Sequence, residues 1–321
     1  MMKAMVYEKY GSPEVLELRE VQKPAPKDDE VLIKVAASSV TPLDWHFLTG
    51  KPYIARLMAG LFKPKYQVLG VDVAGQVEAV GTNFKQFQPG DEVFGLSFIS
   101  GGFAEYLCAP ISEIQMVLKP EKTSFEHAAA IPYVGYTALV CLRDLGELQS
   151  GQKVLVNGAS GGVGTHAVQI AKSFGAEVTG VCSGRNLDMV RSIGADHVVD
   201  YTQEDFTKTD QRYDLIFDAV RKRKFSDCKR VLKREGIYVT TEFSPSLILQ
   251  KQWVSITGDQ KVVPLPIMKP DNQLMLGLKD LLASGEVTPV IDRSYTLAEV
   301  PEAIAYLGKG HARGKIVINI N

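Results

Sequence analysis

The segment Val154–Gly164, with the sequence VLVNGASGGVG, constrains the fold of this chain more than any other. An apolar strand, Val154–Val156, runs into a turn of small residues, and a segment of helical length begins at Thr165. Glycine permits the tight turn and lets another group approach the backbone closely. The start of the helix leaves N–H groups, including those of Gly162 and Val163, without partners inside the helix. The segment therefore predicts an anion site at the end of a strand.

The order of apolar segments around this loop indicates a doubly wound parallel sheet. From about residue 121, short apolar strands alternate with segments of helical length. Elements that alternate in this way form right-handed βαβ units. The predicted strands are Val154–Val156, Val178–Cys182, Val198–Val199, Leu215–Phe217 and Ile237–Thr240. In that setting the loop is predicted to hold the pyrophosphate of a dinucleotide; the alternative is a glycine-rich turn that binds nothing. The residues of this loop predicted to bind the cofactor are Ser160, Gly161, Gly162 and Val163.

The end of the second predicted strand indicates which dinucleotide binds. Sites for NAD carry an Asp or Glu about 20 residues after the glycines. Here the strand ends in Val181–Asn186, VCSGRN, which contains no carboxylate. The Ser183 hydroxyl and the Arg185 guanidinium suit a 2′-phosphate instead. We therefore expect NADPH as the cofactor; the alternative is that Arg185 is a surface residue at the start of a helix.

The first 120 or so residues follow a different pattern, one of short alternating strands. Val31, Ile33 and Val35 alternate with other residues, and glycines or Pro-Gly pairs interrupt such runs every several residues. This pattern is typical of a β-rich domain. A chain of 321 residues is long enough for two domains. We therefore expect an α/β protein in which a β-rich domain accompanies the parallel sheet.

Composition and charge narrow the choice of partners and location. The 36 Lys and Arg residues balance 37 Asp and Glu residues to a net charge of −1, which disfavours a nucleic-acid partner. The cysteines form no CxxC pair, which predicts reduced thiols in the cytoplasm. No signal peptide and no uncharged segment apolar enough to span a bilayer are visible, so we expect no membrane partner.

Several stretches along the chain carry a resemblance to a known family. Examples are FQPGDEVFG at Phe87–Gly95 and HARGKIVI at His311–Ile318, besides the glycine loop. The other stretches are Met5–Glu17, Glu30–Asp44, Leu69–Gly81 and Ala129–Ala138. On these residues the chain resembles the quinone oxidoreductase (zeta-crystallin-like) branch of the medium-chain dehydrogenase/reductase superfamily.

The resemblance implies a GroES-like catalytic domain and a Rossmann domain with a doubly wound parallel sheet. It assigns residues 1–121 and 257–321 to the GroES-like domain, and residues 122–256 to the NADP-binding Rossmann domain. The cofactor and the substrate would share the cleft between the two domains. Members of this branch are usually homodimers or homotetramers, so a homo-oligomer, specifically a dimer, is expected.

The resemblance also bears on metal. The alcohol dehydrogenase branch binds a catalytic zinc through a Cys shortly before Thr-Asp, a Gly-His-Glu motif and a further Cys. This chain has Ser39-Val40, Val71 and Ala130 at those places. A catalytic zinc needs three protein ligands, usually including His or Cys. We therefore expect no metal.

Without a metal, an activated acceptor is favoured over an alcohol. A quinone or another activated carbonyl takes hydride at an electrophilic carbon, and proximity with a few hydrogen-bond donors supplies most of the catalysis. One alternative is an NADPH-dependent reductase of the double bond in an alkenal or enone. Another is a structural or sensor protein that binds NADPH without turnover.

The resemblance suggests roles for particular residues. Tyr53 matches a position near the acceptor, where it would donate a hydrogen bond to the developing oxyanion; the alternative is a loop aromatic packed on its neighbours. Asp44 is the second catalytic candidate, and it is equally consistent with a carboxylate at a helix N-terminus. The other residues implied to contact the cofactor are Thr137, Tyr201, Phe243, Arg313 and Lys315.

Overall fold

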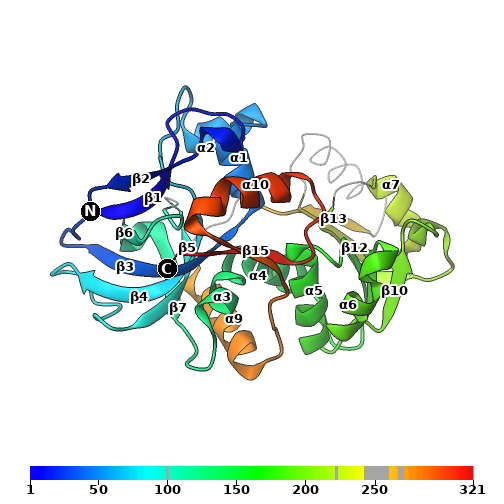
Figure 1. Ribbon diagram of the computed structural model, residues 1–321. Helices are drawn as coiled ribbons and strands as arrows, with labels where there is room; N and C mark the ends of the chain where they lie inside the picture. The colour runs from blue at the N-terminus through cyan, green and yellow to red at the C-terminus, as the bar shows by residue number, and fades with distance from the viewer. Residues whose placement is uncertain (99–100, 221–222, 242–259, 267–270, 321) are drawn as a thin grey trace. The chain divides into compact units, whose positions relative to one another are not determined.

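The computed structural model describes residues 1–98, 101–220, 223–241, 260–266 and 271–320. The chain divides into two compact units, and Figure 1 labels many of their helices and strands. Unit 1 comprises Met1–Tyr133, Pro270–Ala283 and Pro289–Asn321, and unit 2 comprises Val134–Lys269 and Ser284–Thr288. One unit is β-rich and the other contains a parallel sheet, which confirms the predicted α/β class.

The units differ from the predicted domain bounds at three places. Residues 260–266, predicted for the GroES-like domain, belong to unit 2, because their strand β13 (Lys261–Pro264) pairs with β12 (Leu232–Thr240) in its parallel sheet. Residues 122–133 cluster with unit 1, because their helix α3, Phe125–Ala129, packs on strands of that unit. Residues 284–288 cluster with unit 2. There the Gln169 amide donates to the carbonyl of Thr288 over 3.1 Å and accepts the Thr288 N–H over 2.8 Å.

Unit 2 is built on a six-stranded parallel sheet. Its strands are β8 (Lys153–Asn157), β9 (Glu177–Cys182), β10 (His197–Asp200), β11 (Tyr213–Asp218), β12 (Leu232–Thr240) and β13 (Lys261–Pro264). The spatial order is β10-β9-β8-β11-β12-β13, so the chain steps outward from β8 to β10 and then returns to β11 on the other side. This is the order of doubly wound dinucleotide-binding sheets, in which ligands bind at the carboxyl ends of the strands where the order reverses. Every predicted strand is present, and β13 is an additional one.

Helices cover this sheet between successive strands. They are α5 (Gly162–Ser173), α6 (Leu187–Ser192) and α7 (Phe225–Cys228), while α4 (Pro132–Leu139), which continues as a π-helix over Val140–Leu145, precedes β8. Short 3₁₀ turns cover Gly184–Asn186, Phe206–Lys208 and Lys229–Val231. α5 packs on β8 and β9, and α6 packs on β9 and β10. The apolar face predicted for α5 is buried, since Ala167, Val168 and Ile170 are fully inaccessible.

A buried carboxylate joins three neighbouring strands where the strand order reverses. Asp218, at the end of β11, is fully buried. Its Oδ1 accepts a hydrogen bond from the Asn157 amide on β8 over 2.9 Å, and its Oδ2 accepts one from the Tyr238 hydroxyl on β12 over 2.8 Å. Burial raises the pKa of Tyr238, and the negative Asp218 raises it further, so the phenol remains the donor. The ends of β8, β11 and β12 are thus fixed to one another.

Unit 1 contains a seven-stranded sheet and a two-stranded sheet. The strands are β1 (Met2–Val6), β2 (Glu17–Val21), β3 (Glu30–Val40), β4 (Asp72–Val80), β5 (Glu92–Ser97), β6 (Tyr106–Pro110), β7 (Ile114–Leu118), β14 (Ile291–Thr296) and β15 (Lys315–Asn319). β1 pairs with β2, and the larger sheet has the order β14-β15-β3-β4-β5-β7, with β6 also on β3. The central strand β3 pairs with β15, so segments from both ends of the sequence meet in one sheet.

The core of unit 1 follows the alternation seen in the sequence. Val31, Ile33 and Val35 of β3 are buried in one apolar cluster. The helices of this unit are α1 (Pro42–Thr49), α2 (Arg56–Ala59), α3, α9 (Asn272–Ser284) and α10 (Val300–Gly308), with 3₁₀ turns at Pro13–Val15, Tyr53–Ala55, Ile111–Glu113 and Leu297–Glu299. Among the described residues of the whole chain, no helix is long and apolar enough to cross a bilayer.

Candidate cofactor and acceptor site

The turn between β8 and α5 depends on a contact that only glycine permits. Gly158 has a φ of +88°, in the left-handed region that favours glycine. A Cβ atom on Gly164 would lie 2.0 Å from the carbonyl oxygen of Gly158, so the first turn of α5 rests directly on the backbone of the loop. This close approach fixes the start of α5 at the carboxyl end of β8.

Gly161 precedes the same helix in an open environment. A Cβ atom there would have only the Gly158 oxygen as a neighbour, at an ordinary 3.5 Å. The backbone of Gly161 has φ −84° and ψ 174°, which any residue can adopt. A side-chain atom at Gly161, at the positive end of the helix, would therefore meet open space. Such a turn fits the pyrophosphate of a dinucleotide.

The loop after β9 reaches the glycine turn through one side chain. Nδ2 of Asn186 lies 3.0 Å from Oγ of Ser160 and 3.2 Å from Oγ of Ser183. The Asn186 side chain, in a residue only 4% exposed, thus joins two of the predicted cofactor residues. Asn186 was not among the residues predicted from the sequence, although it ends the VCSGRN stretch, because sequence spacing does not show which distant group a side chain contacts.

Arg185 and Tyr201 lie beside this junction. Arg185 is exposed within the turn Gly184–Asn186. The Tyr201 N–H donates to the carbonyl of Cys182 over 3.1 Å, which places Tyr201, directly after β10, next to the end of β9. Tyr201 is 55% exposed. Hydrogen bonds from the Thr202 hydroxyl and N–H, and a weaker one from the Gly184 N–H, lower the pKa of Asp200 at the end of β10. The structure therefore gathers Ser160, Ser183, Arg185 and Tyr201 at one edge of the sheet.

The remaining predicted cofactor residues are distributed over both units. Thr137 lies in α4 of unit 2 and is 2% exposed. Arg313 and Lys315 belong to unit 1, where the exposed Arg313 donates its backbone N–H to Asp292 over 2.9 Å. Phe243 lies outside the described residues.

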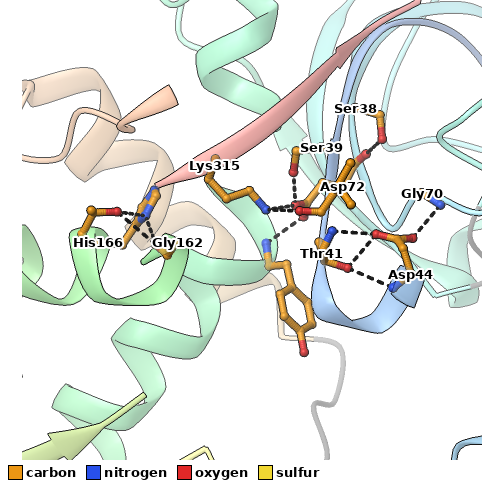
Figure 2. A network of polar contacts seen from close by, with 12 residues as sticks. Ser38, Ser39, Thr41, Asp44, Gly70, Asp72, Gly162, His166 and Lys315 are labelled. Atoms are coloured by element: carbon orange, nitrogen blue, oxygen red, sulfur yellow. Dashed lines mark hydrogen bonds and ion pairs between the residues drawn. The ribbon is translucent and has the colours of Figure 1, made fainter. Parts of the chain in front are cut away.

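Lys315 is buried in unit 1 against a carboxylate. Its ammonium lies 3.1 Å from Oδ2 of Asp72 and donates to the carbonyl of Val40 over 3.3 Å (Figure 2). Ser39 donates its hydroxyl to Oδ2 of Asp72, and the Tyr133 N–H donates to Oδ1 over 2.8 Å. A buried ion pair needs such further hydrogen bonds to offset its desolvation. The ammonium is thus neutralised inside unit 1, and a contact of Lys315 with the cofactor stays a prediction.

Asp44 is fully buried near the N-terminus of α1 (Figure 2). Its Oδ2 accepts the Thr41 N–H over 2.8 Å and the Thr41 hydroxyl over 2.7 Å, and its Oδ1 accepts the Gly70 N–H over 2.9 Å. Thr41 and Asp44 form a capping box, which satisfies backbone N–H groups at the helix start. Burial raises the pKa of Asp44 to about 6 in spite of these hydrogen bonds. The contacts account for Asp44 as a helix cap, and its catalytic role stays a prediction.

Tyr53 lies on an exposed apolar surface of unit 1. The residue is 71% exposed, and the Arg56 guanidinium lies 5.0 Å from the centre of its ring. The neighbouring large apolar residues are exposed as well, most of all Phe62, at 90%. We call the segment 53–62 the apolar segment; its exposed members are Tyr53, Ile54, Leu57, Leu61 and Phe62.

At the positions where zinc-dependent relatives carry metal ligands, this chain has side chains that are hydrogen-bonded or packed within unit 1. The Ser39 hydroxyl is bonded to Asp72, while Val71 and Ala130 are buried apolar side chains. Within the described ranges, no three His, Cys, Asp or Glu side chains are grouped so that they could hold a metal ion.

Comparison with known proteins identifies the family. The family model described as "Alcohol dehydrogenase GroES-like domain" matches residues 27–121, and the one described as "Zinc-binding dehydrogenase" matches residues 193–318. The chain is 33% identical over 332 residues to quinone-oxidoreductase QR1 of Triphysaria versicolor, with 99% of this chain and 98% of the relative covered. It is 34% identical over 331 residues to 2-methylene-furan-3-one reductase of Solanum lycopersicum, with 99% and 79% covered. The quinone oxidoreductase structure from Coxiella burnetii superposes with a TM-score of 0.89 at 29% identity, covering 100% of this chain and 99% of that one.

The fold and the glycine turn define an oxidoreductase that depends on a nicotinamide dinucleotide. It combines a GroES-like domain with a Rossmann-like parallel-sheet domain. Within that class, the chain belongs to the quinone oxidoreductase branch of the medium-chain dehydrogenase/reductase superfamily, which confirms the resemblance.

Two glycine variants should separate cofactor binding from folding. Gly161→Ala places a methyl group in open space, so the free energy of unfolding should change by less than about 1 kcal/mol. The same methyl group should obstruct the pyrophosphate and weaken dinucleotide binding at least about tenfold. Gly164→Ala drives its methyl group into the Gly158 carbonyl and should destabilise the fold by roughly 1–3 kcal/mol. Denaturant unfolding and fluorescence titration with NADPH measure both quantities; unhindered NADPH binding by the Gly161 variant would contradict the assignment.

The buried Asp44 carboxyl should make stability depend on pH. Its pKa is about 6 in the folded chain, above the ordinary value of 3.8. Between these values the folded state holds a proton that the unfolded chain has released, so the free energy of unfolding falls as pH rises from about 4 to about 6. The decrease attributable to Asp44 is on the order of 3 kcal/mol. Asp44→Asn removes this contribution, so the difference in stability between wild type and variant should change across that window and stay constant above it. Parallel curves from pH 4 to 7 would show that Asp44 titrates normally.

Proposed function

We propose that this chain is an NADPH-dependent oxidoreductase that transfers hydride to a quinone or another activated carbonyl without zinc. The observation that carries the cofactor assignment is the loop after β9. Ser183 and Arg185 stand where NAD-binding relatives of this fold carry a carboxylate, and Asn186 joins Ser183 to Ser160 of the glycine turn. Hydroxyl donors and a guanidinium favour a phosphate at this place, whereas a carboxylate would repel it.

In the proposed reaction the protein binds the cofactor and donates a hydrogen bond to the acceptor. The bound cofactor supplies the hydride. The N–H groups at the start of α5 hold the pyrophosphate, and Ser183 with Arg185 holds the 2′-phosphate. Tyr53 donates its phenolic hydrogen to the acceptor oxygen on which negative charge develops. Because charge on a quinone or enone oxygen is delocalised, one such donor with correct positioning is sufficient.

Two observations support a flat apolar acceptor and a reaction without zinc. The apolar segment, which contains Tyr53, offers exposed Leu57 and Phe62 to an apolar ring. Ser39, Val71 and Ala130 supply no ligands of the kind that catalytic zinc sites use. The relative QR1 is named a quinone-oxidoreductase, which supports a quinone as the acceptor.

The second candidate is a reductase of alkenal or enone double bonds. The relative named 2-methylene-furan-3-one reductase, at 34% identity, supports it. Both reactions place hydride on an electrophilic carbon conjugated to a carbonyl, so the same residues serve either. A protein that binds NADPH without turnover is the third candidate. A homodimer in the cytoplasm stays a prediction for all three.

An acceptor panel tests the proposed reaction. The purified protein should consume NADPH with 1,4-benzoquinone or a small enal, and chelators should leave the rate unchanged. Simple secondary alcohols with NADP⁺ should give no turnover, because no Lewis acid would polarise the hydroxyl.

Tyr53→Phe should lower kcat about tenfold, the equivalent of one lost hydrogen bond. Product analysis distinguishes a hydroquinone from a saturated carbonyl. Chelator-sensitive alcohol oxidation would refute the proposal, and absence of turnover with every acceptor would favour a binding protein.

The cofactor assignment has its own test. Arg185→Ala should weaken NADPH binding about tenfold to a hundredfold, because a charge-assisted hydrogen bond contributes roughly 1.5–3 kcal/mol. NADH carries no phosphate there, so its affinity should hardly change. Ser183→Asp should go further, since a carboxylate repels the phosphate and accepts from a ribose hydroxyl. Fluorescence titration with each cofactor gives the ratio of the dissociation constants for NADPH and NADH. Equal weakening of both cofactors by Arg185→Ala, or a wild type that prefers NADH, would remove the basis for an NADPH pocket.

A further inference from the structure

Asn186 occupies a position between the two loops at the proposed phosphate site. The residue is 4% exposed, and its Nδ2 lies 3.0 Å from the Ser160 oxygen and 3.2 Å from the Ser183 oxygen. Its backbone N–H donates to the Ser183 carbonyl over 2.8 Å, which fixes the turn that carries it. The side chain therefore holds the glycine loop and the loop after β9 at a fixed separation.

The chemistry of these contacts determines which way the hydroxyl hydrogens face. A side-chain amide nitrogen carries two hydrogens and accepts nothing. Each serine oxygen therefore accepts one hydrogen from Asn186, and its own O–H remains to donate to another group. Among the described residues, neither hydroxyl donates to a protein atom. A phosphate is an acceptor only, so two hydroxyls prepared in this way suit it.

We infer that Asn186 is a positioning residue, which keeps the hydroxyls of Ser160 and Ser183 available as hydrogen-bond donors to the 2′-phosphate of NADPH. The inference rests on the proposed function, because it takes that phosphate as the ligand. Asn186 itself does not need to touch the cofactor. It acts through the two serines, and Arg185, the residue before it, adds the positive charge.

The other atom of the amide shows that packing alone does not account for Asn186. Its Oδ1 is buried and accepts no hydrogen bond from the described residues. Burying an amide is unfavourable unless its polar atoms are bonded, so an apolar residue of similar size would fill this space better. The polar contacts that the side chain does make are the two serine hydroxyls. Retaining an amide here is therefore explained by its action on those hydroxyls.

The carboxylate of Asp200, which contacts the loop after β9, is engaged by groups other than the serines. Asp200 accepts the Gly184 N–H, the Thr202 N–H over 3.0 Å and the Thr202 hydroxyl over 2.7 Å. A Cβ atom on Gly184 would lie 2.5 Å from Asp200 Oδ2, so this carboxylate holds the loop close to β10. The serine hydroxyls thus remain directed by Asn186.

Two substitutions of similar size test the inference. Asn186→Asp replaces the donor by a carboxylate, which draws both hydroxyl hydrogens toward itself and adds negative charge; NADPH affinity should fall about a hundredfold. Asn186→Leu removes the amide without adding charge and should weaken NADPH about tenfold. NADH affinity should stay within about threefold in both. Titrations with 2′,5′-ADP and 5′-AMP measure the phosphate contribution without turnover, and thermal unfolding shows whether each variant folds.

A double-mutant cycle provides the decisive comparison. In a Ser160→Ala/Ser183→Ala background, Asn186→Leu should have no further effect on NADPH affinity, because the groups through which it acts are gone. This result, with selective loss of NADPH binding in the single variants, supports the inference. A wild type that binds NADPH and NADH equally refutes the proposed cofactor and the inference together. A wild type that prefers NADPH, combined with unchanged cofactor ratios in the Asn186 variants or with additive effects in the cycle, refutes the inference alone.

Discussion

The rest of unit 2 depends on how closely α5 approaches the turn that precedes it. The contact between Gly164 and the carbonyl of Gly158 leaves no room for a side chain. Because α5 begins against the end of β8, its free N–H groups lie at the place where the strand order reverses. The same turn carries Ser160 to Asn186, and so it connects the glycine loop to the loop after β9. A single close backbone contact thereby positions the groups proposed for the pyrophosphate and for the 2′-phosphate of the cofactor.

In unit 1 a buried ion pair, rather than a close backbone contact, joins strands that are distant in sequence. Asp72 and Lys315 are 243 residues apart in sequence and form a buried pair that connects β4 to the last strand of the chain. Ser39 on β3 donates to the same carboxylate. A buried pair of this kind is stable only while all its partners are present. The network therefore gives one arrangement to strands from distant parts of the sequence, at the place where zinc-dependent relatives would carry metal ligands.

Sequence periodicity predicted the elements of this fold well, because strand and helix patterns are local. The runs at Val154–Val156 and Val178–Cys182 became β8 and β9, and the glycine spacing predicted the close packing of Gly164. What escaped prediction depends on pairs of distant residues. Nothing in VCSGRN indicates that Asn186 meets Ser160, and nothing near Lys315 indicates Asp72 as its partner. The exposure of Tyr53 is likewise a tertiary property, set by which surface of its turn the rest of unit 1 leaves uncovered.

The two units differ in the kind of recognition they can provide. At the proposed phosphate site, Asn186 holds the hydroxyls of Ser160 and Ser183 in place in advance, and a ligand without the phosphate would leave these two donors unpaired. Sites of this type discriminate strongly between a ligand that carries the bonded group and an analogue that lacks it. The apolar segment presents Leu57 and Phe62 and few polar groups, and an apolar surface distinguishes ligands by only about 1–3 kcal/mol per methylene. The proposed roles of these two regions therefore predict a chain that is selective for its cofactor and tolerant of its acceptor. That asymmetry suits a reductase whose acceptors share an electrophilic conjugated carbon but differ in shape.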